Sequence, residues 1–318
     1  MSDALRKPIR FDGRVVVVTG AGRGIGRAAA LLFAARGAKL VINNRISEDR
    51  ASDPAGELAA LIETLGGIAA PERSDMTSAT ASRSIVELAL DRFGRIDAVV
   101  HNAGILESRR VAELADEDLG RVYATNVLSA FRLTREVLPT MRRQGSGRLV
   151  FTTSTAALYG GPGLGAYGMA KAAIIGLMRA VAAEEAENGI LANAVCPTAV
   201  TRMTEAFVQD EALRRALSPE RAVPAIAWLA SEACRSSGRV ILASGGLFRS
   251  AYTFQNDGLD LRGRSTILPE DLAEHSEAIL APTALRGFAD SGEHFTALIE
   301  ESSEASRPTR SPVKGIFS

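Results

Sequence analysis

Short apolar segments alternate with longer helical patterns between residue 14 and about residue 245. Val15–Val18 is expected to form a buried strand, and a helix of small residues is expected to follow from Ile25 to Ala35. Further strands are expected at 40–42, 98–100, 149–151, 191–195 and 240–242, and further helices at 57–65, 82–93 and 166–186. Strands that are apolar on both faces and separated by helices indicate a parallel sheet covered on each side. The pattern therefore predicts an α/β fold with a Rossmann-like, doubly wound parallel sheet.

The strand–helix alternation stops after about Gly246. Residues 255–318 lack it, and Ser, Glu and Arg are concentrated between residues 300 and 310. We expect a single domain at residues 10–250 and a C-terminal extension at residues 251–318, with one helix near Pro269–Ile279 and a loose end. The extension is interpreted as a surface arm or partner contact rather than as a second catalytic domain.

Composition and charge narrow the class of protein. The 37 basic Lys and Arg side chains equal the 37 acidic Asp and Glu side chains, so nothing indicates a nucleic-acid or membrane partner. Two cysteines are too few for a disulfide framework. The N-terminal segment has no apolar stretch typical of a signal peptide, and no apolar run approaches the roughly 18 residues that span a bilayer. We expect a cytoplasmic protein with a small-molecule substrate and no metal site.

The first expected strand leads through a glycine-rich loop, residues 19–26, into a helix. Its glycines permit a tight turn, let the backbone approach a pyrophosphate, and direct a helix N-terminus at the negative charge. A plain strand-to-helix turn would need one glycine, whereas this loop has four within seven residues. The loop predicts a dinucleotide site that includes Gly20, Arg23, Gly24, Ile25 and Gly26.

The position after the second expected strand bears on the choice of cofactor. NAD enzymes usually place a carboxylate there to accept the ribose hydroxyls. Asn44 removes the repulsion toward a 2′-phosphate, and Arg45 together with Arg23 could bind that phosphate. The sequence therefore favours NADP over NAD, with the alternative that both arginines are solvated surface groups.

Asp75 and Met76 follow the second expected helix of the domain. We expect them beside the adenine edge of the cofactor. Asp75 is equally compatible with a helix N-cap, because Asp before Met-Thr-Ser suits that role.

Tyr167 and Lys171 are four residues apart, which places them on one face of a helix. A free phenol has a pKa near 10, and a nearby ammonium with a positive nicotinamide favours the phenolate. A decrease of about three pKa units corresponds to roughly 4 kcal/mol of charge stabilisation. Ser154, which follows an expected strand, would hold the substrate oxygen during hydride transfer. Each residue is ordinary alone, but together and behind a glycine loop they predict an oxidoreductase site.

Over residues 10–248 the chain resembles the short-chain dehydrogenase/reductase family. The family motif Thr-Gly-x-x-x-Gly-x-Gly matches residues 19–26. The family's Asn-Ala-Gly, which supports the adenine ring and the central strand, matches Asn102, Ala103 and Gly104. The resemblance places the four catalytic side chains at Asn126, Ser154, Tyr167 and Lys171.

The resemblance also assigns roles to these positions. Asn126, in an expected helix, would hold a water that continues a proton relay from Lys171. Tyr167 and Lys171 would also contact the cofactor. Pro197 and Val200 fall where the family's backbone meets the nicotinamide carboxamide, although Thr198 stands where the family often has glycine.

Within the family, the chain is similar to the (3R)-hydroxyacyl-CoA dehydrogenase domain of peroxisomal-type multifunctional enzymes and to bacterial single-domain relatives. The likeness rests on residues 201–204, 217–220 and 228–234 and on a polar insert at 46–54. Trp228 is interpreted as a core residue. That branch has Asp in place of Asn44 and prefers NAD. Its acyl-CoA substrates make Arg202, Arg214 and Arg215 candidate contacts of a CoA phosphate, with a solvated helix face as the alternative.

The segment Thr198–Leu217 is expected to close the substrate pocket, as in the family, and its Met203, Phe207 and Leu213 suggest an apolar substrate body. We therefore expect an NAD(P)-dependent ketoreductase or alcohol dehydrogenase acting on a 3-hydroxyacyl thioester or a bulky ring alcohol or ketone. The alternatives are a non-catalytic dinucleotide-binding redox sensor and an NAD-dependent dehydratase or epimerase. The resemblance further implies a homodimer or homotetramer built partly on the helix that contains Tyr167.

Overall fold

The computed structural model describes residues 7–46, 52–202, 204–205 and 208–305, with side chains described up to residue 301. The expectations for Met203 and Phe207, and for residues 47–51 of the polar insert, lie outside the described residues. The chain divides into two compact units, Met1–Ala251 and Tyr252–Ser318.

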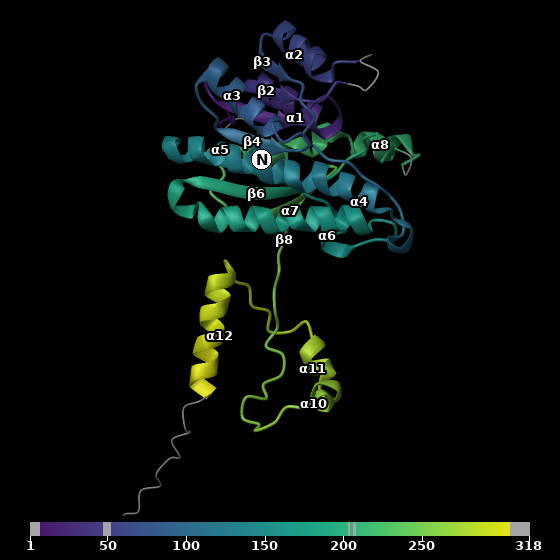
Figure 1. Ribbon diagram of the computed structural model, residues 1–318, viewed down its shortest axis with the longest axis vertical. Coiled ribbons are helices and arrows are strands. Elements are labelled where there is room, and N and C mark those ends of the chain that lie inside the picture. Colours follow the sequence, from purple (N-terminus) through teal and green to yellow (C-terminus); the bar gives the residue numbers. More distant parts are fainter. Residues whose placement is uncertain (1–6, 47–51, 203, 206–207, 306–318) are drawn as a thin grey trace, which may run out of the picture. The chain divides into compact units, whose positions relative to one another are not determined.

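An eight-stranded sheet forms the centre of the first unit (Figure 1). Its order is β3-β2-β1-β4-β5-β6-β7-β8, and every neighbouring pair is parallel except β7 with β8. The strands are β1 (Val15–Thr19), β2 (Lys39–Asn43), β3 (Ile68–Glu72), β4 (Ala98–His101), β5 (Gly147–Thr152), β6 (Ile190–Thr198), β7 (Val240–Ser244) and β8 (Leu247–Ala251). The structure confirms the predicted Rossmann-like fold.

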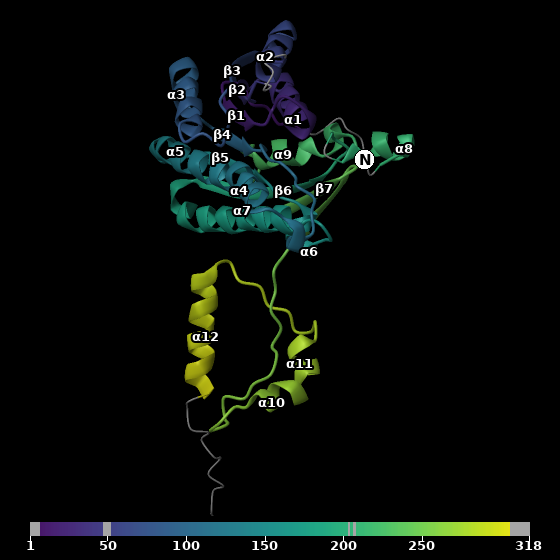
Figure 2. The same cartoon turned by 45° about the vertical axis from the view of Figure 1, so that its right-hand side comes forward.

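Successive residues of the central strands point to opposite faces and enter two separate cores. Val16 and Val18 pack with α1 (Gly24–Ala35), α2 (Pro54–Thr64) and α9 (Val223–Leu229). Val15 and Val17 pack with α3 (Ala81–Phe93), α5 (Ser129–Gln144) and α7 (Gly165–Glu184). Figures 1 and 2 show α3, α5 and α7 together on one side of the sheet. Because both faces are covered, the central strands β1 and β4 are almost entirely apolar.

Shorter elements complete the first unit. They are α4 (Asp116–Tyr123), α6 (Thr155–Tyr159), α8 (Glu211–Ala216), the 3₁₀ turns η2 (Val111–Glu113), η4 (Ala186–Asn188) and η6 (Pro219–Arg221), and the π-helical turn η3 (Ala124–Leu128). The turn η3 lies between α4 and α5, so these three elements form one continuous helical stretch that bulges at Asn126.

Two edge strands of the sheet were absent from the sequence-based prediction. β3 contains Pro71, which an edge strand tolerates because one side of its backbone is unpaired. β8 follows β7 through a hairpin in which Gly245 and Gly246 have φ values of 58° and 94°. A Gly-Gly pair between two strands is the signal that would have identified this hairpin.

Trp228 departs from the prediction in the opposite sense. The sequence pattern assigned this side chain to the core, but it is 37% exposed. The helix α9 instead turns Ala225, Ile226 and Leu229 toward the sheet. A seven-residue helix buries one face, and Trp228 lies outside it.

Helix α7 is long and apolar enough to cross a membrane, with a mean hydropathy of 1.3 over its most apolar 18 residues. It is the only such helix within the described part of the chain. Ile174, Met178 and Val181 on its buried face belong to the core formed with α3 and α5. Packing against β5 and β6 accounts for its apolar composition.

The second unit contains α10 (Pro269–Glu274), α11 (Ser276–Leu280) and α12 (Ser291–Ala305). The one helix expected near residues 269–279 is thus two short helices separated at His275. The sequence predicted a loose C-terminal end. This prediction is wrong for Ser291–Ala305, which form the helix α12. An isolated antiparallel bridge joins Gln255 to Arg286, whose guanidinium pairs with Glu301 of α12 at 2.9 Å.

Candidate active site

The candidate residues of the sequence analysis follow the carboxyl ends of neighbouring parallel strands. The chain order reverses between β1 and β4, which are paired through Val18 and Val100. Ligands of open α/β sheets bind in the crevice outside the strand ends at such a reversal. The sheet therefore brings the loops after β1, β2, β4, β5 and β6 to a single edge.

The glycine loop after β1 has the backbone that only glycine adopts readily. Gly20 and Gly24 have φ values of 61° and 53°, in the left-handed region. A Cβ atom on Gly26 would lie 2.3 Å from the carbonyl oxygen of Gly20. Ile25 is half-buried against the core that α1 shares with α2 and α9. The loop thus closes tightly, and α1 begins at its end.

The N-terminus of α1 retains its capacity to bind an anion. Its N-cap residue, Arg23, makes no side-chain capping hydrogen bond, and the first turn contains no acidic residue. The first backbone N–H groups of a helix have no partner within the helix. This end of α1 therefore fits a cofactor diphosphate.

Asn102 and Ala103 hold the glycine loop in place from β4. The Nδ2 atom of Asn102 donates hydrogen bonds to the carbonyl oxygens of Thr19 at 3.1 Å and Gly20 at 3.0 Å. The Oγ1 atom of Thr19 accepts from the backbone N–H groups of Asn102 and Ala103, both at 3.1 Å. These four hydrogen bonds connect the first and fourth strands at the reversal of chain order.

Asn44 lies beside the glycine loop at the end of β2. Its Oδ1 atom accepts from the backbone N–H of Gly22 at 3.3 Å, and its Nδ2 atom donates to the carbonyl of Arg45 at 2.9 Å. Burial lowers the pKa of the Arg23 guanidinium, and the charges of Arg202 and Arg45 lower it further. The three arginines therefore raise the positive potential beside the loop.

Asp75 holds a turn rather than a helix end. Its Oδ1 atom accepts from the N–H of Thr77 at 2.8 Å and from Oγ1 of the same residue at 2.7 Å. The N-cap of α3 is Thr80, so the helix-capping alternative for Asp75 is wrong. The Nε atom of Arg45 lies 3.8 Å from Oδ2 of Asp75, and Met76 beside it is buried.

Tyr167 and Lys171 lie one turn apart in α7. The Nζ atom of Lys171 is 5.6 Å from the centroid of the Tyr167 ring and donates to the carbonyl of Thr152 at 3.0 Å. The side chain of Lys171 is 4% exposed. Its burial lowers the pKa of Lys171 to about 8, so the ammonium titrates close to neutral pH.

The pKa of Tyr167 shifts opposite to the sequence-based expectation. Burial raises the pKa of the phenol, while a hydrogen bond with Ser154 acts in the lowering direction. Ser154 is the N-cap of α6, and its Oγ atom accepts from the N–H of Ala156 at 3.2 Å. Among the chain's own groups, desolvation of the phenol outweighs its stabilising contacts.

Asn126 lies in the π-helical turn η3, within the helical stretch that the sequence predicted. Its Nδ2 atom donates to the carbonyl oxygens of Ile105 at 3.0 Å and Val122 at 2.9 Å. Its Oδ1 atom is buried and has no hydrogen-bond partner among the described residues. A buried acceptor of this kind is normally satisfied by an ordered water, which is the role that the family assigns to this residue.

Gly104 lies between Asn126 and Lys171. A Cβ atom on Gly104 would be 2.5 Å from Oδ1 of Asn126 and 3.2 Å from Nζ of Lys171. The bare backbone of Gly104 therefore lets the two side chains approach the same point. The structure brings Asn126, Ser154, Tyr167 and Lys171 to one edge of the sheet, as the motif spacing predicts.

Cys196 is a neighbour of the site that the sequence analysis did not assign to it. The residue lies on β6 and is 1% exposed. Burial raises the pKa of its thiol to about 11, and the charge of Lys171 opposes that rise. Nothing in the sequence spacing connects residues 171 and 196, because the contact depends on how α7 packs on β6.

The loop after β6 contacts the glycine loop at the start of α1. Pro197 and Thr198 remain in the strand, and the N–H of Val200 donates to the carbonyl of Leu217 at 2.7 Å. The Cγ2 atom of Thr201 lies 3.2 Å from the Cβ position of Gly24. Thr201 therefore sits against the N-terminus of α1, a position that the sequence analysis did not assign to it.

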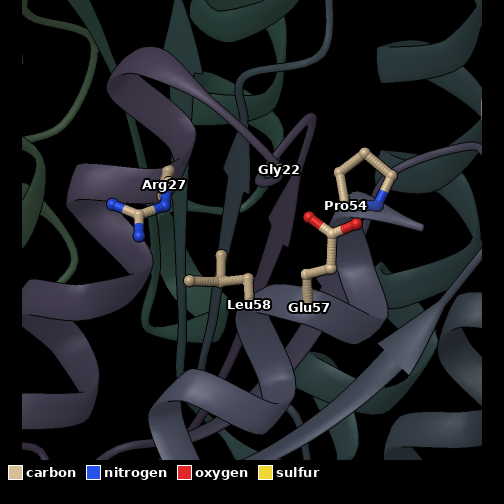
Figure 3. Close-up of a pocket in the computed structure, with 5 residues that line it drawn as sticks. All are labelled: Gly22, Arg27, Pro54, Glu57 and Leu58. Carbon is tan, nitrogen blue, oxygen red and sulfur yellow. The ribbon is translucent and has the colours of Figure 1, made fainter. Parts of the chain in front are cut away.

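A small pocket lies between α1 and α2, and Gly22 is one of the residues that line it (Figure 3). Arg27 of α1 and Glu57 and Leu58 of α2 line it, together with Pro54. It contains none of the four catalytic candidates. Within the described part of the chain, no cluster of three or more His, Cys, Asp or Glu side chains is arranged to hold a metal ion.

Comparison with known proteins agrees with this geometry. A family model for the short chain dehydrogenases matches residues 14–212. The chain is 37% identical over 280 residues to the mouse peroxisomal multifunctional enzyme type 2, covering 86% of this chain and 38% of that enzyme. It is 36% identical over 245 residues to a 3-oxoacyl-[acyl-carrier-protein] reductase of Synechocystis sp., covering 74% of this chain and 98% of the reductase.

A solved structure is similar over most of its length. The short chain dehydrogenase from Mycobacterium avium superimposes with a TM-score of 0.76 and 35% sequence identity, covering 87% of this chain and 99% of that chain. The predicted resemblance is confirmed by these matches. The chain therefore belongs to the short-chain dehydrogenase family and is an oxidoreductase that uses NAD(H) or NADP(H).

Proposed function

We propose that the protein interconverts a 3-oxoacyl and a 3-hydroxyacyl thioester with NADP(H) as the hydride carrier. The observation that carries this proposal is the convergence of Tyr167, Lys171 and Asn126 beside a dinucleotide-type glycine loop. A redox sensor would have no use for a buried proton-transfer set.

Bound nicotinamide would supply or accept the hydride at the substrate carbon. In the reductive direction, the Oη atom of Tyr167 donates its proton to the developing alkoxide. The Oγ atom of Ser154, which shares a hydrogen bond with Tyr167, holds the substrate oxygen in line. In the oxidative direction, the same phenol oxygen accepts the alcohol proton.

After proton transfer to the substrate, Lys171 and Asn126 restore the proton on the phenol of Tyr167. The Nζ atom of Lys171 lies 5.6 Å from the centroid of the Tyr167 ring, and a nearby ammonium favours the phenolate. The pKa of Lys171, about 8, allows it to exchange a proton near neutral pH. A water accepted by Oδ1 of Asn126 would carry that proton onward, because Gly104 leaves the space between the two side chains open.

The proposed cofactor preference rests on the end of β2. Asn44 carries no charge, so it does not repel a 2′-phosphate. Arg45 and Arg23 lie close enough for their charges to interact. The exposed pair between Arg45 and Asp75 is long, at 3.8 Å, and such pairs contribute little free energy. A 2′-phosphate would therefore compete with Asp75 for the guanidinium of Arg45.

The proposed substrate class rests on the similarity to the Synechocystis reductase, whose name specifies a 3-oxoacyl thioester. In the part of the post-β6 segment that the structure describes, Leu213 is 46% exposed. An exposed apolar side chain there suits an acyl chain. A bulky ring ketone is the second candidate from the sequence and serves as a comparison substrate.

We also propose a homodimer or homotetramer that functions in the cytoplasm. The outward face of α7 consists mainly of small residues at helical spacing, including Ala172, Gly176 and Ala180, with Met169 49% exposed. Small side chains allow two helices to approach closely. A second copy of α7 would cover this face.

Two measurements test the proposal. The first compares NADPH and NADH binding by nicotinamide fluorescence in the wild type, Arg45→Ala and Asn44→Asp. We expect tighter NADPH binding, lost in both variants, and NADH binding that improves in Asn44→Asp. Tighter NADH binding that is indifferent to Arg45 would contradict the NADP preference.

The second measurement is the rate of ketone reduction with an acetoacetyl thioester and with a bulky ring ketone. We expect turnover of the thioester, and a loss of at least about 100-fold in kcat for Tyr167→Phe. Reduction of the ring ketone alone would replace the proposed substrate class and leave the oxidoreductase assignment intact.

A further inference from the structure

The loop after β6 is fixed in contact with the glycine loop. The Oγ1 atom of Thr204 donates to the carbonyl of Ala199 at 2.8 Å and accepts from the N–H of Thr201 at 3.0 Å. The carbonyl of Thr201 accepts from the backbone N–H groups of Thr204 and Glu205, both at 2.8 Å. These hydrogen bonds hold Thr201 where its methyl group faces Gly24 at the start of α1.

This contact places two cations beside each other, because Arg202 follows Thr201 and Arg23 precedes Gly24. Both side chains are exposed. Neither forms an ion pair with an acidic side chain among residues 7–46, 52–202, 204–205 and 208–301. The charge of Arg202 is the larger of the two arginine effects that lower the pKa of Arg23.

Arg23, Arg202 and the N-terminus of α1 thus all add positive potential beside the glycine loop. Like charges repel unless an anion lies between them, and no acidic residue occupies the first turn of this helix. Guanidinium groups bind phosphate oxygens through paired N–H donors. The arrangement is complementary to a diphosphate.

We propose that Arg202 binds the diphosphate of the dinucleotide together with Arg23, so that the loop after β6 contributes a cation to the cofactor site. This inference rests on the proposed orientation of the cofactor along the glycine loop. Arg45, after the end of β2, serves the ribose end, and the charge of Arg23 interacts with both Arg45 and Arg202. Arg202 thereby acts on NAD(H) and NADP(H) alike, whereas Arg45 distinguishes them.

The test uses ADP, which has the diphosphate, and AMP, which lacks it, as probes in isothermal titration of the full chain. We expect Arg202→Gln to weaken ADP binding about tenfold and AMP binding much less, because a charge-assisted phosphate contact is lost. NADH and NADPH binding should weaken by the same factor. Arg83→Gln, at an exposed position of α3, is the matched control and should leave all four affinities unchanged.

Several outcomes would overturn the inference. Unchanged ADP binding in Arg202→Gln, with a melting temperature equal to that of the wild type, would remove Arg202 from the cofactor site. Weaker binding of coenzyme A with ADP binding retained would assign the arginine to a thioester substrate instead. Equal losses of AMP and ADP affinity in Arg202→Gln would indicate that the substitution disturbs the loop. If Arg202→Lys recovers ADP binding, a disturbed loop is not the cause.

The failure of this inference is distinguishable from the failure of the proposed function. If wild-type protein binds neither ADP nor NADPH nor NADH, the cofactor site itself is wrong. If wild type and Arg202→Gln both bind ADP equally and both reduce the acetoacetyl thioester, only the role of Arg202 is wrong.

Discussion

Gly104 lies so close to Asn126 that a Cβ atom on the glycine would be 2.5 Å from the amide oxygen Oδ1. The same oxygen is buried without a hydrogen-bond partner in the described part of the chain. A methyl group there would occupy the place where a water could bridge Asn126 and Lys171. Gly104 is therefore as much a part of the proposed proton path as the two side chains that it separates.

Gly104→Ala is expected to lower kcat by about 10- to 100-fold, because it removes one member of a proton-transfer chain. The dissociation constant for NADPH should change little. Gly120→Ala is the matched control, since a Cβ atom at Gly120 meets no other atom within 4 Å. Steady-state kinetics with a solvent isotope effect checks this prediction, and an unchanged kcat in Gly104→Ala would argue against the path.

Lys171→Met is expected to inactivate the enzyme and to stabilise the fold at pH 7. The pKa of Lys171 is about 8 in the folded protein, against 10.5 for an exposed lysine. Below pH 8, Lys171 is protonated in both the folded and the unfolded protein. The folded protein therefore bears the whole free-energy cost of the buried charge, about 3 kcal/mol at most. Loss of the hydrogen bond to the carbonyl of Thr152 offsets about 1 kcal/mol of the gain.

The same shift predicts how this stabilisation depends on pH. Between pH 8 and 10.5 the unfolded chain holds more protons at residue 171, so wild-type stability from this group rises with pH. The advantage of Lys171→Met should therefore shrink by pH 9.5. Urea unfolding at pH 7 and 9.5 measures it, with Lys7→Met as the control. A gain of equal size at both pH values would contradict the assignment of a buried ammonium.

His101 is expected to make the fold sensitive to acid. Its ring is buried, stacks on Phe151 with centroids 4.5 Å apart, and has a pKa of about 3 because of burial. Between pH 6.5 and 3 the unfolded state holds the additional proton, so stability falls as pH falls. From pH 7 to pH 5 this group should cost about 2 kcal/mol.

The slope of unfolding free energy against pH tests this effect. His101→Asn loses the ring stacking with Phe151, so its stability at pH 7 will be lower, but the decline from pH 7 to 5 should be shallower than in the wild type. His294→Asn in α12 serves as the control. Parallel slopes for wild type and His101→Asn would show that the histidine does not carry the acid sensitivity.

Two glycine substitutions are expected to act in opposite directions. A Cβ atom on Gly26 would lie 2.3 Å from the carbonyl of Gly20 and 2.5 Å from Nδ2 of Asn102. Gly26→Ala should cost about 1–3 kcal/mol and weaken NADPH binding, because the loop must shift. Gly120→Ala in α4 meets no atom within 4 Å and should gain up to about 1 kcal/mol from helix propensity.

Urea unfolding and NADPH titration of the two variants compare these effects. If Gly120→Ala does not stabilise the protein, helix propensity at this position does not limit the stability of α4. Wild-type affinity for NADPH in Gly26→Ala would show that the close approach at the loop is not required.

The place of the proposed catalytic motif in the fold was predictable because its parts are local. The glycine loop stands between a strand and a helix, and Tyr167 and Lys171 are one helical turn apart, so short-range periodicity is sufficient to place them. The edge strands β3 and β8 were not predicted, because Pro71 and the Gly-Gly turn obscure the alternating hydrophobic pattern that identifies a strand. The exposure of Trp228 was not predicted, because only packing decides which face of a short helix is buried.

The sequence by itself determined the doubly wound fold, because strand and helix periods are local properties, and its family motifs indicated the candidate proton-transfer residues. Tertiary structure alone decided the environment of those residues. It raised the pKa of Tyr167 by burial, left Oδ1 of Asn126 without a protein partner among the described residues, and set Arg202 beside Arg23. These properties depend on distances between segments far apart in the chain and on exclusion of water, which come into existence only when the sheet and its helices pack together.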